Sequence, residues 1–507
     1  MADHDHNDCP LLFDDPGDID RLRELLARLN YTDQGVSELL GIQGARSMSE
    51  LDVPLLLHGT DGGSPLETLV RLFLIGVSVE SRAARQATEP MELDQWVKAG
   101  LLQIQDDSVV GAMRLLPFQG LVLAFDLPQR IETEQGIDYV MGVGSSTITL
   151  ANLTVRRPSR LTLDLGTGCG FQALLAAPHS EQVMAVDTNP RAVRIAAFNA
   201  RLNGLSNVAS LEGDLFAPVE GHAFDLVVSN PPFVISPETR FIYRDSGMHG
   251  DQITHTIVRR VPDYLCEGGF CQILCNWTQT TGEDWRQRLA GWFEGTGCDA
   301  WVIRSDTLAA SAYASKWIRH TERDAPQQFR DRFDQWMDYY RQEQIETISG
   351  GLITMRRRSE AVPWFRADDA PEKMLGPAGD GVLLGFELRD FLEATRDDQV
   401  LLSRRLRISP DVRLQQQLQP CPKGWLIDDA ELQLRLCRGL AYSGNVDPYV
   451  AHLLARCDGQ RVLGEVLREV AGFLEREPAD VLPAMLDIVR RLVEQGFLLP
   501  EDCDHTT

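Results

Sequence analysis

The 507-residue chain lacks any apolar run near the ~18 residues that a membrane-spanning helix needs, so we expect no membrane span and no membrane partner. Its acidic N-terminus, Met1–Asp8, lacks the basic start and apolar core of a signal peptide, which predicts a cytoplasmic protein. The ten cysteines include no Cys-x-x-Cys pair and no Cys/His grouping at zinc spacing, so we expect reduced thiols and no metal site. Basic residues are scarce, with 49 Lys and Arg against 74 Asp and Glu. The resulting net charge of −25 disfavours nucleic acid as a partner without excluding it.

The remaining composition is that of a globular chain, with 43% hydrophobic and 24% charged residues, and it excludes a disordered or fibrous protein. At roughly 150 residues per domain, the length suggests two to four domains. We predict a helix-rich N-terminal domain over residues 1–118 as a candidate for substrate recognition, an α/β domain over 119–360 with a helical insertion near 306–346, and a C-terminal domain over 361–507. The last part, Tyr449–Leu499, shows two or three helices followed by a strand, which predicts a winged-helix-like module.

The central region alternates short apolar runs with amphipathic stretches. This order is typical of parallel strands that are covered by helices on both faces, so the fold class is α/β. The predicted strands are Leu161–Leu165, Val183–Asp187, Val208–Leu211, Phe224–Ser229 and Phe270–Cys275. A later pair of strands is expected on either side of the insertion, at Trp301–Arg304 and Leu352–Arg356.

The first motif with chemical meaning is Asp-Leu-Gly-Thr-Gly-Cys-Gly at residues 164–170, where an apolar strand enters a glycine-rich turn that opens a helix. Glycines allow the backbone to approach a ligand closely and to adopt conformations that a side chain forbids. The spacing differs from the Gly-x-Gly-x-x-Gly of dinucleotide-binding folds, which disfavours a dehydrogenase. A purely structural turn is the alternative. The candidate binding residues are Asp164, Gly166, Thr167, Gly168 and Gly170.

Two aspartates that follow the next strands extend this candidate site. Asp187 ends the second strand, seventeen residues after Gly170, where a carboxylate can accept hydrogen bonds from two ribose hydroxyls. Asp214 follows the third strand and suits contact with an adenine amino group. Each aspartate alone has an equal alternative, a helix cap near Pro190 for the first and a turn after Gly213 for the second. Together with the glycine turn, they predict a bound nucleoside.

The most specific motif is Asn230-Pro231-Pro232-Phe233, which follows the fourth strand. The prolines fix the backbone, remove two amide donors and leave carbonyls free to accept. The Asn230 side chain and the Pro231 carbonyl can therefore hold both hydrogens of a planar –NH2 group, while Phe233 offers a ring on which it can stack. Positioning supplies the rate, and no strong base is required because the nitrogen becomes acidic once it is alkylated. A rigid surface turn is the alternative.

These elements occur in the order seen in class I S-adenosylmethionine-dependent methyltransferases. The Asn-Pro-Pro-aromatic element resembles the branch that methylates adenine, guanine and protein glutamine. Within that branch the chain most resembles the release-factor glutamine methyltransferases, over the central domain only, roughly residues 135–300. The segments that carry the likeness are residues 164–170, 187–193, 229–233, 244–248, 268–270 and 276–277.

The resemblance implies a Rossmann-like class I domain with a seven-stranded, mostly parallel sheet, flanked by the helical N-terminal and α+β C-terminal regions, and S-adenosyl-L-methionine as cofactor. It implies that residues 164–170, Asp187 and Asp214 hold the cofactor, and that the Asn-Pro-Pro-Phe motif holds the acceptor. The chain departs from the family at Phe233, where Tyr is usual. It also lacks the Arg-Pro-x-Thr-Glu-like element before the first strand, where residues 142–147 are expected to line the methionine end of the cofactor.

We therefore predict an N-methyltransferase whose acceptor is a protein or peptide, with a glutamine side-chain amide as first choice. The alternative is methylation of an exocyclic base nitrogen in RNA or DNA, for which a base would be flipped into the pocket. Phosphate contacts would then come from Arg259, Arg260 or Arg356–Arg358. A remote alternative is a non-catalytic binding protein that keeps the cofactor fold, which the intact Asn-Pro-Pro-Phe motif disfavours.

Overall fold

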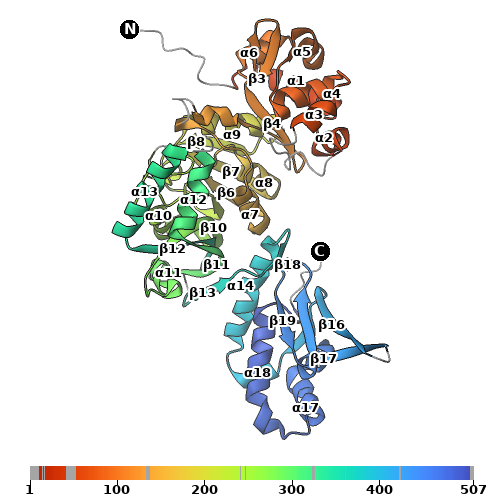
Figure 1. Cartoon of the computed structure of the whole chain (residues 1–507). Coiled ribbons are helices and arrows are strands. Elements are labelled where there is room, and N and C mark those ends of the chain that lie inside the picture. Colours follow the sequence, from red (N-terminus) through yellow and green to blue (C-terminus); the bar gives the residue numbers. More distant parts are fainter. Residues whose placement is uncertain are drawn as a thin grey trace. The chain divides into compact units, whose positions relative to one another are not determined.

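The computed structural model describes residues 11–13, 15, 17–41, 53–132, 137–239, 241–245, 247–321, 326–359, 361–421 and 424–502. Contacts within the chain divide it into two compact units (Figure 1). The first comprises residues 1–151 and 157–368, and the second comprises residues 152–156 and 369–507. Each unit encloses a buried apolar core of its own.

The N-terminal region of the first unit consists of short helices and two small sheets, one of order β1-β3-β2 and one formed by the hairpin β4-β5. Helix ends follow local sequence signals: α2 begins after Thr32, whose hydroxyl accepts from the Gly35 amide at 3.0 Å, and ends at Gly41 in the left-handed conformation (φ 64°). The elements are α1 (Gly17–Arg28), α2 (Asp33–Leu40), α3 (Val53–His58), α4 (Pro65–Val70), β1 (Val79–Glu80), α5 (Ser81–Thr88), α6 (Leu93–Lys98), β2 (Leu102–Gln105), β3 (Ser108–Gly111), β4 (Met113–Phe118) and β5 (Leu121–Asp126).

Strand β5 is joined to helix α9 (Pro190–Leu202) of the central region by asparagine side chains. The Asn199 amide bonds both backbone groups of Ala124, at 2.8 and 2.9 Å. Asn203, one turn later, does the same with Val122 at 2.9 and 2.8 Å. Each side-chain amide thus pairs with the backbone N–H and C=O groups of β5, as a neighbouring strand would. These bonds attach the N-terminal region to the central region, and both belong to one compact unit.

The central region is built on a sheet that has eight strands among the described residues, in the order β13-β11-β12-β10-β9-β6-β7-β8. The strands from β10 to β8 run parallel, and β12 runs antiparallel to β10 and β11. The order reverses between β6 and β9, the position at which open α/β sheets bind ligands beyond the carboxyl ends of their strands. The strands are β6 (Ser159–Leu165), β7 (Ser180–Asp187), β8 (Val208–Glu212), β9 (Phe224–Ser229), β10 (Leu265–Thr280), β11 (Cys298–Ala309), β12 (Ile345–Arg357) and β13 (Phe365–Asp369).

The predicted α/β class with a mostly parallel sheet is confirmed by this topology. Strand β13, beside β11, is added to the seven strands expected. Its sequence, Phe-Arg-Ala-Asp-Asp, contains one large apolar residue and is only half-buried, so it carries little strand signal.

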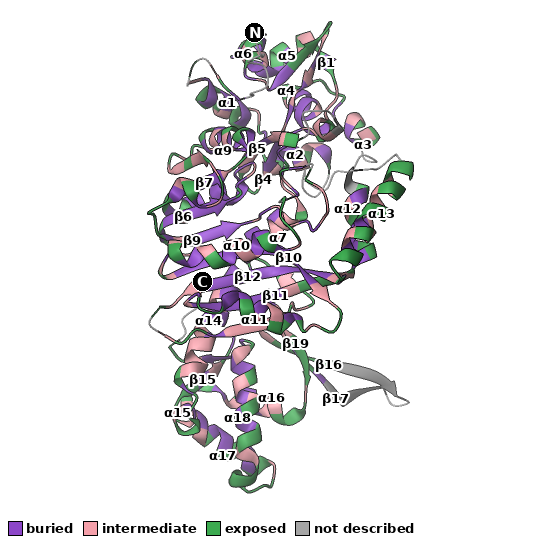
Figure 2. Ribbon diagram, turned by 90° about the vertical axis from the view of Figure 1, so that its left-hand side faces the viewer, coloured by how far each residue is buried: buried purple, intermediate pink, exposed green. Residues whose placement is uncertain are grey.

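Helices cover both faces of this sheet, whose inner strands are buried (Figure 2). Alternate residues of β6, such as Leu161 and Leu163, pack in one core with α10 and α11, and this core also encloses Cys271 and Cys275. On the opposite face, α8 and α9 share a core with the N-terminal region. The helices are α7 (Ser145–Leu153), α8 (Phe171–Ala176), α9 (Pro190–Leu202), α10 (Gln252–Arg260) and α11 (Trp285–Phe293).

Two further helices, α12 (Ala310–Thr321) and α13 (Pro326–Gln342), form a helical hairpin between the antiparallel strands β11 and β12. Their facing sides carry the buried rings of Tyr313, Trp336 and Tyr340. The pair lies within residues 306–346, the stretch for which a helical insertion is predicted. Figure 2 shows the two helices as a separate arm of the central region.

The second unit combines helices with three small sheets, of order β20-β15-β21, β16-β17-β19 and β14-β18. Helices α16, α17 and α18 bury leucine and valine side chains against β15 and β21. The α+β character is confirmed, whereas the winged-helix assignment and the three domain boundaries stay predictions. The elements are β14 (Met374–Leu375), α14 (Gly379–Ala394), α15 (Asp398–Leu402), β15 (Arg405–Ile408), β16 (Val412–Cys421), β17 (Gly424–Leu436), β18 (Gly439–Leu440), β19 (Ser443–Val446), α16 (Pro448–Arg456), β20 (Asp458–Val462), α17 (Leu463–Phe473), α18 (Pro478–Glu494) and β21 (Leu498–Pro500).

Candidate active site at the strand ends

A cavity of about 400 Å³ opens where β6, β7 and β9 end, at the point where the strand order reverses. This volume is within the range of small-molecule sites in proteins. Eight of the ten residues predicted from the sequence line it: Asp164, Gly166, Thr167, Gly168, Asp187, Asp214, Asn230 and Pro231. The lining does not include the other two, Gly170 and Phe233.

The glycine turn after β6 forms one wall. Gly166 and Gly168 have positive φ angles of 74° and 55°, a region that side chains rarely adopt. A Cβ on Gly168 would meet open space, and one on Gly166 would approach only the Pro231 Cα, at 3.9 Å. The glycines therefore leave the cavity side of the turn bare, so that a ligand can lie directly against the backbone. This is the fit that a nucleoside cofactor requires.

Gly170, predicted to bind the cofactor, lies at the junction of two helices, and its cofactor role stays a prediction. It begins α8 with φ 86°, and a Cβ there would come within 3.1 Å of Ala196 on α9. Only glycine allows α8 and α9 to pack this closely. The signal that distinguishes the two roles is the distance to a second helix, which the local sequence does not contain.

Asp164 braces the same turn from below. Its Oδ2 accepts a hydrogen bond from the Thr167 hydroxyl at 2.6 Å and another from the Ala173 amide at 3.0 Å. Burial raises the pKa of this carboxyl to about 7, although both hydrogen bonds oppose the rise. Asp164 thus borders the cavity, and its two hydrogen bonds connect the end of β6 with the glycine turn and with α8.

Asp187 occupies the end of β7 and faces the cavity. Its Oδ2 accepts from the Gly168 amide at 2.8 Å and its Oδ1 from the Asn189 amide at 2.9 Å. Burial raises the pKa of Asp187, and the backbone amides of Asn189 and Gly168 act against that rise. Asp214 lies beyond the end of β8 and is exposed at the cavity rim.

The Asn-Pro-Pro-Phe motif follows β9. Ser229, the last residue of the strand, donates to the Leu165 carbonyl at 2.8 Å and so ties the motif to the glycine turn. The Asn230 side-chain oxygen is buried, and no donor among the described residues reaches it. Buried acceptors in proteins are nearly always paired, so this atom marks a place where a ligand's N–H group is expected.

Phe233 lies away from the cavity lining. Its ring is partly buried against the core of the α12–α13 hairpin, 6.3 Å from the Trp317 ring in an edge-on contact. The structure therefore places Asn230 and Pro231 in the lining of the cavity, but not Phe233. That Phe233 stacks on the acceptor stays a prediction.

Two further segments contribute to the cavity lining, the first with residues 139–142 and 147, the second with residues 239, 242–243, 245 and 247–248. The first is fixed by Asp126, whose carboxylate is paired with Arg191 and accepts from the Val140 amide at 2.8 Å. Gly142 and Thr147, from the stretch expected at the methionine end of the cofactor, line the cavity. Edge-on contact between Tyr139 and Tyr243, 5.3 Å apart, joins the two segments. Neither tyrosine belongs to a motif, because their meeting depends on chain folding between residues far apart in the sequence.

In the part of the chain that the structure describes, no helix is long and apolar enough to cross a membrane. The same residues contain no group of three or more metal-ligating side chains.

Comparison with protein families places known models on three parts of the chain. The model "Methyltransferase small domain" matches residues 141–290, which contain the glycine turn, both aspartates and the Asn-Pro-Pro-Phe motif. Residues 28–112 and 385–500 match two domains of unknown function, DUF7059 and DUF7782.

Individual relatives match the central region as well. A provisionally named protein N5-glutamine methyltransferase of Methanocaldococcus jannaschii is 35% identical over 136 residues, which are 25% of this chain and 68% of the relative. The release factor glutamine methyltransferase of Escherichia coli is 35% identical over 159 residues. That match covers 28% of this chain and 55% of the relative, so the chain spans about half its length.

Among solved structures, that of M. jannaschii TYW2 in complex with AdoMet is 15% identical with a TM-score of 0.28, over 49% of this chain and 87% of the other. The family model matches the part of the chain that contains the glycine turn and the parallel strands of the sheet. The chain belongs to the family of S-adenosyl-L-methionine-dependent methyltransferases that carry the methyltransferase small domain.

Proposed function

We propose that the enzyme transfers a methyl group to the side-chain amide nitrogen of a glutamine in a protein. The observation that carries this proposal is the buried Asn230 oxygen that has no donor in the described part of the chain. Leaving such an acceptor unpaired costs about 1–3 kcal/mol, which a bound N–H group would recover. A primary amide offers two N–H groups in one plane, and the Pro231 carbonyl beside Asn230 is suited to accept the second.

The chain's own residues then act by positioning. With both amide hydrogens held by Asn230 and Pro231, the acceptor nitrogen presents one face to the glycine-turn side of the cavity. S-adenosyl-L-methionine supplies, when bound there, a methyl group on a positively charged sulfur. Because Asn230 and Pro231 contribute only acceptor oxygens, they stabilise the positive charge that develops on the nitrogen's hydrogens. No side chain has to remove a proton before transfer, because the methylated nitrogen is acidic and releases one proton to water, while the sulfur that gives up the methyl group would leave as an uncharged thioether.

The cofactor would lie along the turn formed by Gly166, Thr167 and Gly168. We propose that Asp187 binds the ribose hydroxyls, since its carboxylate faces the cavity at the end of β7. Asp214, exposed at the rim, is proposed to contact the adenine. Asp164 and Gly170 support this site indirectly, by bracing the turn and by allowing α8 and α9 to pack.

A protein acceptor is supported by the relatives named for glutamine methylation and by the state of the arginines that would otherwise bind phosphates. Arg356 pairs with the buried carboxylate of Asp299 at 2.6 Å. Arg259 donates to the Glu294 carbonyl at 2.5 Å, and Arg260 lies over the Phe216 ring. Nucleic acid would have to compete with these contacts.

The test is methyl transfer from radiolabelled S-adenosyl-L-methionine into a cell extract, followed by protease or nuclease digestion. We expect the label to be lost with protease and retained with nuclease. Acid hydrolysis should then release volatile labelled methylamine, because an N-methyl amide is cleaved whereas methylated lysine and arginine are stable. Label that is lost with nuclease would instead identify a base nitrogen as the acceptor and overturn the proposal.

A further inference from the structure

The segment that follows the Asn-Pro-Pro-Phe motif is bound by the α12–α13 hairpin, which lies outside the family model. That model ends at residue 290, whereas the hairpin spans residues 310–342. The motif is therefore held by an element that the family pattern does not include. Four groups of contacts connect the hairpin with residues 233–250.

The first contact fixes the backbone of Ile235, two residues after the motif. The Tyr340 hydroxyl donates to the Ile235 carbonyl at 2.8 Å, and the Ile235 amide donates to the Tyr313 hydroxyl at 3.2 Å. Both tyrosines are buried, and burial raises the pKa of each phenol, so they stay protonated. Tyr313 also accepts from the Asn276 side chain of β10 at 2.7 Å. The hydroxyls of α12 and α13 thus replace a strand neighbour for Ile235.

The second contact is the edge-on packing of Phe233 against Trp317 of α12. The third is the Tyr339 hydroxyl of α13, which accepts from the Gly250 amide at 3.0 Å, where the segment enters α10. These contacts hold the beginning and the end of the segment. Its middle is held by charge.

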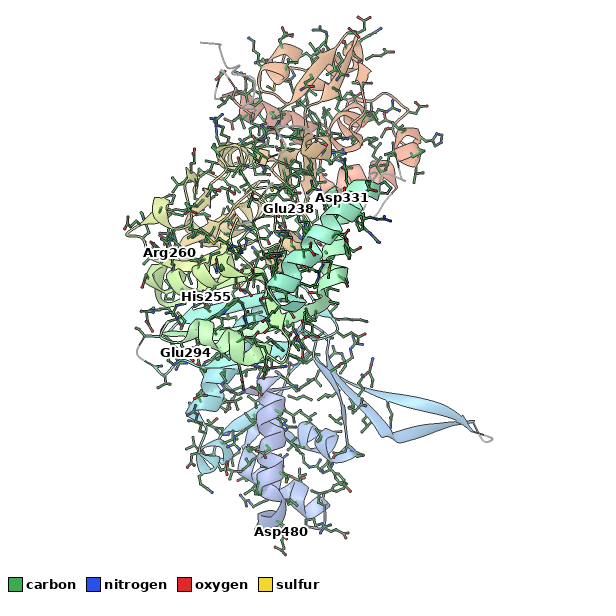
Figure 3. The ribbon with its side chains drawn as sticks, turned by 60° about the vertical axis from the view of Figure 1, so that its left-hand side comes forward. Glu238, His255, Arg260, Glu294, Asp331 and Asp480 are labelled. Atoms are coloured by element: carbon green, nitrogen blue, oxygen red, sulfur yellow. The ribbon has the colours of Figure 1, made fainter. Side chains whose placement is uncertain are left out.

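The fourth contact is a buried group of charges around Glu238. Its Oε1 accepts from Arg332 at 2.7 Å and from the Trp336 ring nitrogen at 3.0 Å, both on α13. Its Oε2 accepts at 2.9 Å from Arg244, which also bonds Asp245 at 2.9 Å. Glu238 lies beside α13, which also carries the exposed Asp331 (Figure 3). In this group the charges of Glu238 and Asp245 are balanced by those of the two arginines. Asp245 also lines the cavity.

These contacts act on the reacting groups through a short, stiff connection. Ser229 is anchored to the Leu165 carbonyl, and Ile235 is anchored to the two tyrosines. Between the anchors lie Pro231 and Pro232, whose rings fix two φ angles. The Asn230 oxygen and the Pro231 carbonyl therefore have little freedom to turn.

We infer that the α12–α13 hairpin is the positioning element of the acceptor site, and that Tyr313, Tyr340 and Arg332 are positioning residues for methyl transfer. The inference rests on the proposed function only in that Asn230 and Pro231 receive the acceptor. The hairpin does not touch the glycine turn or Asp187 by any hydrogen bond among the described residues. Acceptor geometry and cofactor affinity are thus held by separate contacts.

The test compares Tyr340→Phe with Tyr31→Phe. Tyr31 is a matched control, because its buried hydroxyl donates to the Leu115 carbonyl at 2.7 Å in the N-terminal region. Hydrogen exchange of the amides in residues 233–239 is measured first, since it requires no acceptor. We expect exchange to rise about tenfold in Tyr340→Phe, as a lost hydrogen bond allows, and to be unchanged in Tyr31→Phe.

Labelled transfer into extract protein is measured next, with the dissociation constant of S-adenosyl-L-methionine from equilibrium dialysis. For Tyr340→Phe we expect the rate at saturating cofactor to fall between about tenfold and about hundredfold, with cofactor affinity unchanged. Tyr31→Phe should keep both values. Wild-type exchange in Tyr340→Phe, or a parallel loss of cofactor affinity, would overturn the positioning role.

The charged contact gives an independent pair of variants. Arg332→Ala removes a guanidinium that bonds Glu238, whereas Arg330→Ala removes an exposed one two residues away on α13. Only the first should increase exchange and slow transfer, and Arg332→Lys should restore part of both. Equal effects of the two alanine variants would contradict the inference. Should label appear in nucleic acid, the proposed acceptor would be wrong, while the exchange results would still decide the role of the hairpin.

Discussion

The two sides of the cavity are built in different ways. On the cofactor side, the turn after β6 and the aspartate after β7 are held by hydrogen bonds between residues close to strand ends, such as Asp187 to the Gly168 amide. On the acceptor side, the motif after β9 is held by a helical hairpin that begins eighty residues later in the sequence, at Ala310. In the proposed mechanism, cofactor binding is therefore a property of the sheet, whereas acceptor binding depends on an added element.

The largest expected effect is that of Asn230→Ala, which removes an acceptor-side oxygen and leaves the glycine turn intact. Methyl transfer at saturating cofactor should fall by about 100- to 1,000-fold, the scale seen when one preorganised electrostatic partner of a reacting group is removed. Equilibrium dialysis should give an unchanged dissociation constant for S-adenosyl-L-methionine. Full activity in this variant would show that Asn230 does not hold the acceptor.

Asp187→Asn should have the opposite pattern, on the cofactor side. Loss of a charged hydrogen-bond acceptor should weaken S-adenosyl-L-methionine binding about tenfold, with the rate at saturation nearly retained. Asp225→Asn is the matched control, because its carboxylate also accepts from two backbone amides, Arg160 and Leu161, but at the opposite end of the sheet. Equal losses of affinity in both variants would indicate damage to the fold instead of a lost ribose contact.

Phe233→Leu tests whether this ring contributes mainly to the stability of the fold or to methyl transfer. Because Phe233 packs against Trp317 and does not line the cavity, we expect the unfolding free energy to fall by about 1 kcal/mol and transfer to slow by less than about tenfold. Urea unfolding and initial rates measure the two effects. A rate loss as large as that of Asn230→Ala, at unchanged stability, would support direct stacking of the acceptor on Phe233.

Asp164 affects the pH dependence of stability, an effect separate from methyl transfer. Its folded pKa, about 7, is above the ordinary value, so the folded state keeps a proton that the unfolded state loses. The contribution of this carboxyl is therefore present below about pH 4 and is lost as the pH rises toward about 7. Asp164→Asn, which keeps an oxygen for Thr167 and Ala173, should remove a decline of about 3 kcal/mol between pH 5 and pH 8. Identical pH profiles of the two proteins would contradict the buried, raised pKa.

The sequence predicted the cofactor side of the cavity more completely than the acceptor side. The strand that enters the glycine turn and the aspartate at the end of β7 were both visible as local patterns, and the parallel sheet was predicted from the order of such patterns. The Asn-Pro-Pro-Phe motif was equally visible. Its four residues, however, do not reveal that Phe233 packs against Trp317 of α12.

What the sequence did not reveal depends on residues that meet only in the folded chain. Gly170 reads as one more glycine of the turn, and only the 3.1 Å approach of Ala196 identifies its packing role. Tyr139 reaches the cavity because Asp126 and Arg191 hold the Val140 backbone. No local sequence pattern predicts such contacts, because each is formed by single residues that are far apart in the sequence.

The most direct measurement is to identify the methylated residue. Protein labelled in an extract by the wild-type enzyme and by Asn230→Ala would be digested completely with proteases, and its amino acids separated. The proposed mechanism predicts a labelled peak of N5-methylglutamine with the wild-type enzyme and none with the variant. Label in methylated lysine or arginine, in nucleosides, or equally with both enzymes would contradict the claim that Asn230 and Pro231 hold a glutamine amide for methyl transfer.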